Sequence, residues 1–450
     1  MTIAIARQVA LEVLLRVEAD DAYANLLLNQ LSTSKRLDSR NAALAQELAF
    51  GSLRRKNTLE AIINEVSSRP VGDLDLGVRA VMQLGVYQLL YTRIPVHATL
   101  NESVEQSKAF AGGKASGLVN ASLRKVAQHD LEHWMTVILA KATNETDRLA
   151  LKYAHPSWIV TSLRLALSAD GRAAELEHLL ESDNEPARVN LVALPGQVDR
   201  ATLDDFEQHV SSPIGYLAQP GNPGEIPAVA DGSMRVQDAG SQLVALVAAH
   251  GANSNESWLD LCAGPGGKAV LMAALAKSTS STLTCVEPAP HRAELVRKAL
   301  SASGFSAKVR QLDGREITGS FDRVLVDAPC TGLGALRRRP EARWRKSPGD
   351  LKALNLLQKE LVEAAWSVLK PGGVLTYSTC SPHPSETTAI VEQALRSFGE
   401  TAELLNANSI LSEIEPSLRL NPNRKTAQLW PDRDDTDAMF IAVIRKREVV

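Results

Sequence analysis

Strand-like and helical segments alternate along the carboxyl-terminal half of this 450-residue chain. Runs rich in β-branched residues are expected to form strands at SWLDL (257–261), STLTCVEP (281–288), FDRVLVDAP (321–329) and GGVLTYST (372–379). Helical segments are expected at residues 267–276, 289–302, 350–369 and 385–398. Alternation at this spacing is typical of βαβ units, so it predicts a mostly parallel α/β sheet with helices on both faces.

The amino-terminal segment has a different pattern. Apolar residues recur at helical spacing in Ala10, Val13, Leu14 and Val17, and no useful alternation of period two appears. This periodicity predicts a small all-α bundle over residues 1–132.

Residues 133–235 are mixed in character. A helical stretch from Trp158 to Leu167 precedes a strand-like run that includes Val189 and Val192. The Pro/Gly-rich run 219–232 is expected to be a loop and to mark the boundary before the last domain, residues 236–450. The sequence therefore predicts three parts: a helical bundle, a linker with a small α/β extension, and the larger α/β domain.

The cysteines exclude several kinds of site. Cys262, Cys285, Cys330 and Cys380 are separated by 23, 45 and 50 residues, so no CxxC pair exists and no metal is expected. Such thiols fit a reducing compartment, and we expect a cytoplasmic protein. The start of the chain lacks a signal-peptide pattern, and no stretch of about 18 apolar residues predicts a membrane span. We expect a monomer with neither membrane nor metal as partner.

A glycine-rich turn joins the first strand-like run to the helix that follows it. In LDLCAGPGGKA (259–269), the glycines allow the backbone to approach a ligand closely, and the helix start supplies free N–H groups. The P-loop pattern fails because position 262 is Cys and position 269 is Ala. The dinucleotide pattern would need Gly at 269, where only its loose form allows Ala. S-adenosylmethionine, which has no pyrophosphate, is the third interpretation.

Acidic residues lie at or just after the ends of consecutive strand-like runs, which include a further run in VRQLDGRE (309–316). They are Asp260, Glu287, Asp313 and Asp327. The carboxyl ends of parallel strands line one crevice, so the set predicts a nucleotide site: Glu287 could hold ribose hydroxyls, and Asp313 could accept from an adenine amino group. Each acid alone is equally compatible with a helix N-cap.

Two cysteines lie just past sheet strands, in DAPCTGLG (327–334) and TYSTCSPHP (376–384). Both loops should open onto the same crevice. Beside a sulfonium methyl donor, a thiolate that adds to carbon 6 of cytosine would place electron density on carbon 5, which can then attack the methyl group. Asp327 could hydrogen-bond ring nitrogen 3 and the exocyclic amine, and the second thiol could assist proton removal and release.

At these residues the sequence resembles a known family. Residues 236–450 are similar to the RNA cytosine-5 methyltransferases of the NOL1/NOP2/Sun group, which have a class I, Rossmann-like fold. The matching runs are DLCAGPGGK, FDRVLVDAPCTGLG, RRRPEARW (337–344) and LKPGGVLTYSTCSPHPSE. The resemblance implies S-adenosylmethionine as methyl donor. It implies that Cys380 is the nucleophile and that Cys330 assists product release.

The same resemblance implies which residues bind the cofactor or adjoin the target base. They are Cys262, Ala263, Gly264, Pro265, Gly266, Gly267, Lys268, Glu287, Arg292, Asp313 and Asp327. The amino-terminal bundle resembles the NusB antitermination fold, an RNA-binding bundle, in RQVALEVLLRV and in residues 95–125. A NusB-like bundle before such a methyltransferase is the architecture of the RsmB (Sun/Fmu) subfamily, which implies small-subunit (16S) ribosomal RNA as substrate.

A basic segment follows the Cys330 loop. ALRRRPEARWRKS (335–347) carries six basic residues against one acid, although the net charge of the chain is −3. Arg and Lys hold phosphates and an aromatic ring stacks on a base, so the segment predicts RNA contacts. The expected RNA-binding residues are Arg337, Arg338, Arg339, Arg343 and Trp344.

Three other functions compete with methylation of ribosomal RNA. A transfer RNA substrate is the main rival within the same chemistry. A non-catalytic RNA-binding or antitermination factor is disfavoured because Cys330 and Cys380 are both retained in their loops. A Rossmann dehydrogenase is disfavoured by Ala269 and by the lack of a hydride-transfer constellation.

Overall fold

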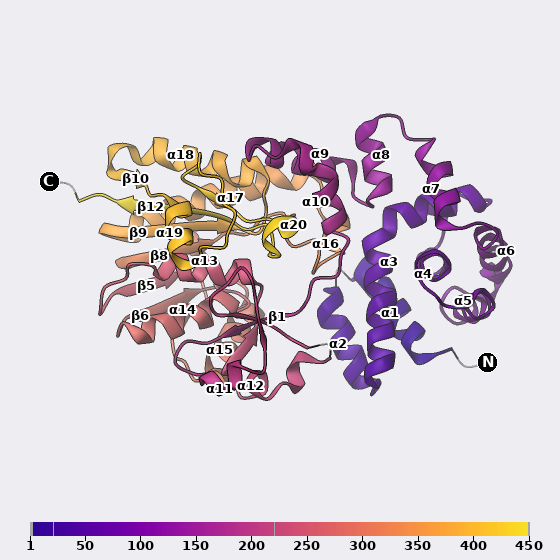
Figure 1. Ribbon diagram of the computed structural model, residues 1–450, viewed down its shortest axis with the longest axis horizontal. Coiled ribbons are helices and arrows are strands. Elements are labelled where there is room, and N and C mark those ends of the chain that lie inside the picture. Colours follow the sequence, from indigo (N-terminus) through magenta and orange to yellow (C-terminus); the bar gives the residue numbers. More distant parts are fainter. Residues whose placement is uncertain (1–2, 21, 220, 449–450) are drawn as a thin grey trace. The chain divides into compact units, whose positions relative to one another are not determined.

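The computed structural model describes residues 3–20, 22–219 and 221–448, and Figure 1 shows the course of the chain. The chain forms two compact units. Unit 1 comprises Met1–Thr161 together with Arg338–Arg345, and unit 2 comprises Ser162–Arg337 and Lys346–Val450. Residues 133–235 are thus shared between the units, and the three-part division with boundaries at 132 and 235 stays a prediction.

Helices make up the described elements of the amino-terminal unit. They are α1 Ile5–Ala19, α2 Ala24–Ser34, α3 Ser39–Val66, α4 Leu76–Tyr91, α5 Val96–Phe110, α6 Ser116–Val126, α7 Leu131–Leu139 and α8 Glu145–Lys152, with 3₁₀ turns η1 Val71–Asp73 and η2 Gly113–Ala115. Their apolar stripes meet in one core that includes Leu11, Leu48, Ile62 and Met82. The all-α bundle expected from the periodicity is confirmed.

Unit 2 begins with a small antiparallel sheet. Helix α9 (Ser157–Ala169) leads into it, and the strand order is β2-β3-β1-β4. The elements are η3 Ala173–Glu175, α10 Leu176–Ser182, β1 Asn190–Ala193, α11 Arg200–Leu203, β2 Glu207–Gln208, β3 Gly215–Leu217, η4 Pro223–Glu225, α12 Pro227–Ala230 and β4 Met234–Val236. The strand expected near Val189 is present as β1. The run 219–232 is not all loop, because η4 and α12 form within it, each with proline in its first turn.

The larger sheet of unit 2 has eight strands in the order β10-β12-β9-β8-β5-β6-β7, with β11 paired to β12. Its strands are β5 Ser257–Asp260, β6 Thr282–Val286, β7 Lys308–Arg310, β8 Phe321–Asp327, β9 Leu369–Thr379, β10 Ala402–Leu404, β11 Ala427–Gln428 and β12 Phe440–Lys446. Strands β7, β6, β5, β8 and β9 are parallel, whereas β12 runs antiparallel to β9 and β10 antiparallel to β12. The mostly parallel Rossmann-like sheet is confirmed, and one edge makes it mixed.

Helices cover both faces of this sheet, as Figure 1 also shows. They are α13 Ala239–Ala249, α14 Gly267–Ser278, α15 Pro290–Ala302, α17 Pro348–Val368, α18 Thr388–Phe398, α19 Ala407–Ile414 and α20 Pro431–Asp434, with 3₁₀ turns η5 Gly314–Glu316, η6 Pro384–Glu386 and η7 Gly399–Thr401. The core on one face contains residues of α13, α14, α15 and α19, and the core on the other contains residues of α17 and α18. Because both faces are covered, the interior of β8 is a continuous buried run.

Local signals explain where the key helices begin. Helix α17 starts at a capping box in which the side chains of Ser347 and Asp350 satisfy each other's backbone N–H groups. Helix α13 starts after Asp238, whose side chain accepts from the Ser241 backbone N–H. No helix within the described ranges is long and apolar enough to cross a bilayer.

Candidate active site

The carboxyl ends of four neighbouring parallel strands meet at one edge of the larger sheet. Strand β5 leads into the glycine-rich turn, β6 into Glu287, β8 ends at Asp327, and β9 is followed by Cys380. Such an edge is where ligands bind in open α/β sheets. The structure therefore brings together the residues on which the sequence-based site prediction depends most.

Two glycines shape the turn after β5. Gly266 has a φ of +112°, a conformation that side chains disfavour, and α14 starts at the next residue. A Cβ atom on Gly264 would lie 2.1 Å from Oε2 of Glu287 and 2.9 Å from Nε of Arg292. Backbone bonds hold the rest of the turn: Ala263 N–H donates to the carbonyl oxygen of Val286 in β6 at 2.9 Å, Gly266 N–H donates to Ala263 O at 2.8 Å, and Pro265 is exposed. The turn thus needs glycine at both positions.

Glu287 and Arg292 form the wall beside this turn. Glu287 is 2% exposed, and its Oε1 accepts from the Ala289 backbone N–H at 3.0 Å. Arg292 donates to the Gly264 carbonyl oxygen at 2.6 Å and places its Nε 3.5 Å from Oε2 of Glu287. A buried carboxylate fixed in this way is a ready acceptor for hydroxyl donors of a ligand.

Lys268, at the start of α14, points back to the strand ends. Its Nζ lies 2.8 Å from Oδ2 of Asp327, and Ser378 of β9 donates to Oδ1 of the same carboxylate at 2.9 Å. Burial lowers the pKa of Lys268, but Asp327, with smaller contributions from Cys380 and Asp260, raises the pKa of the amine above its ordinary value. The Cys380 thiol also interacts electrostatically with Lys268. A protonated amine therefore sits between a carboxylate and a thiol.

Asp260 is the most deeply buried acid at this edge. It is 1% exposed, and neither of its carboxylate oxygens has a hydrogen-bond partner among the described residues. Burial, together with the nearby charge of Asp327, raises the pKa of Asp260 to about 7. The sequence analysis predicted that Asp260 lies in the crevice but predicted no function for it.

Asp260→Asn is expected to change stability in a pH-dependent way. The pKa of Asp260 is raised from its ordinary value of 3.8 to about 7 in the folded chain. Above pH 4 the unfolded chain releases this proton while the folded chain retains it, so the aspartate lowers stability progressively up to about pH 7. The asparagine variant should therefore gain stability relative to the wild type as the pH rises from 5 to 8, measured by urea unfolding.

Asp322→Asn is the matched control for this measurement. Burial raises the pKa of Asp322, but Lys370 and the Ser257 backbone N–H together lower the pKa below its ordinary value. The pKa of Asp322 lies below pH 5 in the folded and the unfolded chain, so loss of this carboxylate should cost a constant amount of stability between pH 5 and 8. A pH-independent difference between Asp260→Asn and the wild type would contradict the buried, partly protonated carboxyl.

The two loop cysteines meet at the same edge. Sγ of Cys330 lies 3.4 Å from Sγ of Cys380, and the two cysteines form no disulfide. The contact with Cys380 and burial raise the pKa of Cys330 well above its ordinary value. Cys330 is therefore a neutral thiol near pH 7, in contact with a second sulfur that Lys268 faces. The described residues contain no cluster of three or more side chains suited to hold a metal ion.

The remaining predicted cofactor residues differ in their surroundings. Cys262 is half-buried in the turn, and burial raises its pKa well above the ordinary value. Cys285, in contrast, belongs to the apolar core inside β6. Asp313 caps η5 and pairs with Arg315 at 2.6 Å, so its carboxylate is already engaged in this structure.

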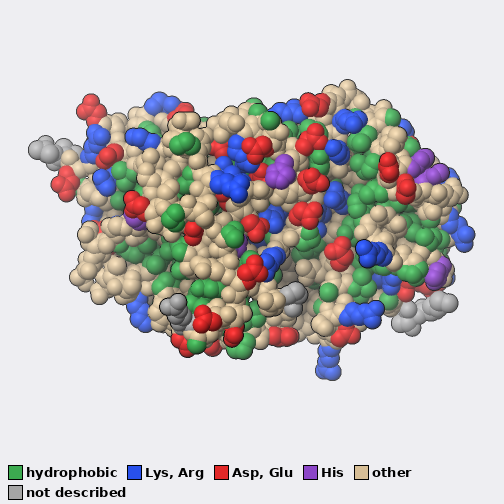
Figure 2. Space-filling view, viewed as in Figure 1, with side chains coloured by type: hydrophobic (Ala, Val, Ile, Leu, Met, Phe, Trp, Pro, Cys, Tyr) green, Lys and Arg blue, Asp and Glu red, His purple; other side chains and the backbone are tan. Residues whose placement is uncertain are grey.

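The predicted RNA-binding residues fall into two groups. Arg337 belongs to unit 2, where its guanidinium pairs with Asp435 at 2.6 Å. Arg338, Arg339, Arg343 and Trp344 belong to unit 1. On the face shown in Figure 2, basic and acidic side chains are intermingled, which agrees with the small net charge of the chain.

Arg343 and Trp344 are built into the helical bundle. The Arg343 side chain is fully buried and donates to the carbonyl oxygens of Arg54 and Ala154, both at 3.1 Å, and Trp344 Nε1 donates to the Leu53 carbonyl at 2.7 Å. Short helix α16 (Ala342–Arg345) carries them. Arg339 differs, because its guanidinium lies over the half-exposed ring of Tyr23. Contact with RNA stays a prediction, for which the exposed Arg339 is better placed than the buried Arg343.

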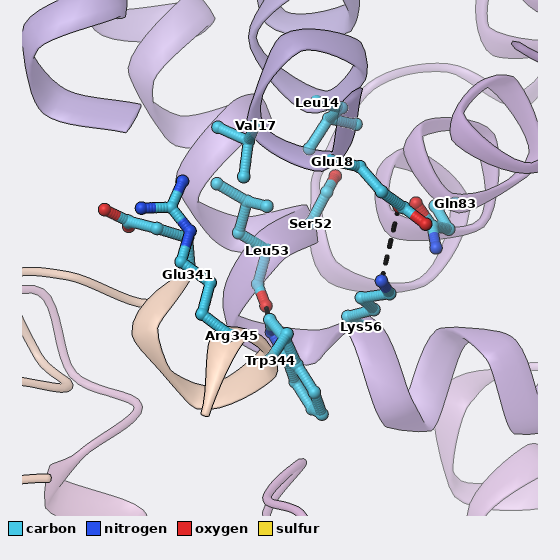
Figure 3. A pocket seen from close by; sticks show the side chains of 10 residues that line it. All are labelled: Leu14, Val17, Glu18, Ser52, Leu53, Lys56, Gln83, Glu341, Trp344 and Arg345. Atoms are coloured by element: carbon cyan, nitrogen blue, oxygen red, sulfur yellow. Dashed lines mark hydrogen bonds and ion pairs between the residues drawn. The ribbon is translucent and has the colours of Figure 1, made fainter. Parts of the chain in front are cut away.

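A cavity of about 250 Å³ lies where this segment meets the bundle, as Figure 3 shows. Glu341, Trp344 and Arg345 of the segment face side chains of α1, α3 and α4 across it. Lys56 and Glu18 form an ion pair of 3.3 Å on its far side. Part of the basic run predicted to contact RNA thus packs on the helices of unit 1 instead, through Trp344 and Arg345.

Sequence reasoning missed two residues of the catalytic edge. Ser378 supports Asp327, and Glu386 binds the residues that follow both cysteines. Ser378 lies within a run predicted as a strand, and its alternation with Tyr377 gave no sign of which neighbour faces Asp327. Glu386 follows Pro382 and Pro384 in a loop, and a lone acid there resembles an ordinary solvated residue.

Two family models match the chain. Residues 248–445 match the model described as 16S rRNA methyltransferase RsmB/F, and residues 4–128 match the NusB family. The two matches cover the α/β part that follows α13 and the first six helices of the bundle.

Similar proteins align over nearly the full length. The protein Rv1407 of Mycobacterium tuberculosis, provisionally named a methyltransferase, is 42% identical over 98% of this chain and 96% of its own. Ribosomal RNA small subunit methyltransferase B of Salmonella newport is 31% identical over 96% of both chains.

Among solved structures, that of PH0851 superposes with a TM-score of 0.82 over 99% of this chain and 100% of its own, at 20% identity. A methyltransferase homologue from Pyrococcus horikoshii covers 66% of this chain and 97% of its own, with a TM-score of 0.52 and 25% identity. The first likeness bears on the fold alone.

Proposed function

Because the chain belongs to the RsmB/F family of 16S ribosomal RNA methyltransferases, with a NusB-family domain before the catalytic part, we propose that it methylates carbon 5 of a cytosine in small-subunit ribosomal RNA. The observation that carries this proposal is the pair of reduced thiols, with 3.4 Å between Sγ of Cys330 and Sγ of Cys380. Methylation at an oxygen or an amino nitrogen needs no thiol, whereas carbon 5 of cytosine must first be activated by a nucleophile.

The crevice residues fit S-adenosylmethionine, the methyl donor of this family. Because Gly264 has no Cβ atom, the turn packs directly against Glu287 and Arg292, which places the Glu287 carboxylate beside the turn. Glu287 offers a buried carboxylate for ribose hydroxyls, and the start of α14 offers backbone N–H groups. Asp260 supplies two buried oxygens without a partner in the described chain. When bound, S-adenosylmethionine supplies an electrophilic methyl group.

The first chemical task of the chain is to generate a nucleophile that activates the cytosine ring. Cys380 adds as a thiolate to carbon 6 of the cytosine, so that a C6–S bond forms and the ring electrons move to carbon 5. The positive charge of Lys268 near the Cys380 sulfur stabilises the thiolate. Asp327, held by Lys268 and Ser378, is positioned to hydrogen-bond the ring as it accepts charge.

The second task is to release the methylated base. Once carbon 5 carries the methyl group, a base removes its proton, the electron pair re-forms the C5–C6 double bond, and the C6–S bond breaks. Cys330 is a neutral thiol in contact with the departing sulfur, so it can donate a hydrogen bond or its proton to Cys380. This division of work supports Cys380 as nucleophile and Cys330 as the residue that assists release.

A tritium-release assay tests the proposal directly. Small-subunit ribosomal RNA labelled with tritium at cytosine carbon 5 should release tritium to water when protein and S-adenosylmethionine are added, and digestion should yield 5-methylcytidine. Transfer RNA labelled in the same way is the second arm. Methylation without tritium release would refute carbon-5 chemistry, and release from transfer RNA alone would refute the ribosomal substrate.

Cys330→Ala is expected to trap the covalent intermediate. Without the thiol that assists release, the Cys380–cytosine bond should persist, and a protein–RNA band should survive a denaturing gel. The Cys330→Ala, Cys380→Ala double variant is the control and should show no such band. A Cys330→Ala protein that turns over at the wild-type rate with no adduct would contradict the role given to Cys330.

A further inference from the structure

A single buried carboxylate joins the two cysteine loops. Glu386, in η6, is fully buried. Its Oε1 accepts from the Thr331 backbone N–H at 2.8 Å and from Gln358 Nε2 at 3.1 Å. Its Oε2 lies 2.5 Å from Thr331 Oγ1 and 2.7 Å from Ser381 Oγ. Four donors on an acceptor-only group leave it fully satisfied as a carboxylate.

The partners of Glu386 are the immediate neighbours of the two thiols. Thr331 follows Cys330 in the chain, and Ser381 follows Cys380. Further bonds fix Glu386 itself: Tyr377 OH donates to its carbonyl oxygen at 2.6 Å, and Gln358 also donates to Pro329 O at 2.9 Å. The loops carry irregular backbone after separate strands, so the covalent chain alone does not set the distance between the sulfurs.

We propose that Glu386 is the positioning residue of the thiol pair, which holds the Cys330 sulfur within reach of the Cys380 sulfur so that release follows methylation. This inference rests on the proposed function for the identity of the step. The geometric part of the inference is independent of the proposed function, because the bonds from Glu386 to both loops exist without RNA. The charge of Glu386 also faces Cys330, where it favours the neutral thiol, whereas Lys268 faces Cys380.

The rate of disulfide formation between the two thiols reports how close the sulfurs lie, and its measurement needs no RNA. Diamide oxidises two close thiols to a disulfide and is itself reduced to the hydrazine, and the rate depends on how often the sulfurs meet. Cys330–Cys380 disulfide formation, followed by mass spectrometry of peptides, should be roughly tenfold slower in Glu386→Ala than in the wild type, since small misplacements of reacting groups have effects of this order. Glu386→Gln should stay within about threefold, because its amide can serve the same partners.

Turnover provides the second measurement. Glu386→Ala should lower kcat with little change in KM for RNA and should accumulate the denaturant-stable adduct, while Glu386→Gln should restore most of kcat. Glu256→Ala is the matched control, because Glu256 is a buried carboxylate of the same unit that binds Trp258 and Arg323 at the opposite ends of the strands. It should lower stability without slowing disulfide formation.

The outcomes separate the two proposals. A folded Glu386→Ala protein that forms the disulfide at the wild-type rate overturns the positioning role. If that variant does not fold, the Thr331→Val, Ser381→Ala double variant removes the two hydroxyl contacts and should slow the disulfide, and an unchanged rate overturns the role equally. A slowed disulfide in a protein that releases no tritium from carbon 5 would refute the proposed function and leave the positioning role standing.

Discussion

Cys380→Ala is expected to abolish methyl transfer, with a loss of more than roughly 10³-fold in kcat, as for removal of other covalent nucleophiles. Without the sulfur, carbon 5 of cytosine stays a poor nucleophile, and no other described thiol can take its place. Burial keeps the pKa of Cys262 and of Cys330 well above the ordinary value, so both are protonated near pH 7, and Cys285 lies in the core. The measurement is incorporation of the tritiated methyl group into ribosomal RNA.

Binding measurements make this loss specific. Cys380 is not among the groups that contact Glu287 or Arg292, so S-adenosylmethionine should bind the variant with nearly unchanged affinity in calorimetry. Cys285→Ala is the matched thiol control and should keep near wild-type activity, since it removes only core packing. Formation of 5-methylcytidine by Cys380→Ala at an undiminished rate would refute the covalent mechanism.

Lys268→Met is expected to cost both stability and activity. The Lys268 side chain is 12% exposed and pairs with Asp327 at 2.8 Å, next to the unpartnered Asp260. Removing the cation leaves the buried Asp260 and the partly buried Asp327 without their positive neighbour. Such a loss costs on the order of 3–5 kcal/mol when the pair is fully buried, so a smaller cost is expected here, where Asp327 is 28% exposed. The Cys380 thiolate loses its stabilising charge at the same time, so kcat should fall by roughly 10²-fold or more.

Lys370→Met measures what an ordinary ion pair contributes in the same unit. Lys370 pairs with Asp322 at the same distance, 2.8 Å, but its side chain is 39% exposed. A pair in this position is worth at most about 1 kcal/mol. Urea unfolding should therefore separate the two variants clearly, and equal losses of stability would contradict the buried character of the Lys268 site.

The sequence was sufficient to predict most of the α/β framework. The β-branched runs at 257–261 and 321–329 became β5 and β8 to within two residues, because strands covered on both faces stay apolar throughout. Strand β12, Phe440–Lys446, escaped prediction. It pairs antiparallel with β9, and only the four-residue helix α20 lies directly before it, so no long crossover helix signals the strand.

The candidate site was predictable where its residues lie at the ends of strands. The glycine turn, Asp327 and the two cysteines all lie at strand ends, and topology alone brings strand ends together. The contacts of Glu386 and Arg343 depend instead on residues far along the chain: Arg343 binds carbonyl oxygens of Arg54 and Ala154. The sequence pattern shows that Arg343 is basic, but it does not show that two backbone carbonyl oxygens lie beside its side chain.

The passage of residues 338–345 through unit 1 bears on how such a protein can be divided or rebuilt. The chain crosses between the units three times, after residues 161, 337 and 345, so no single cut separates them. Truncation at 161 would strip Arg343 and Trp344 of the partners that bury them. The two units are therefore not interchangeable modules. A recombination event that replaced the bundle would also have to replace residues 338–345, which lie far along the chain within the sequence of the catalytic part.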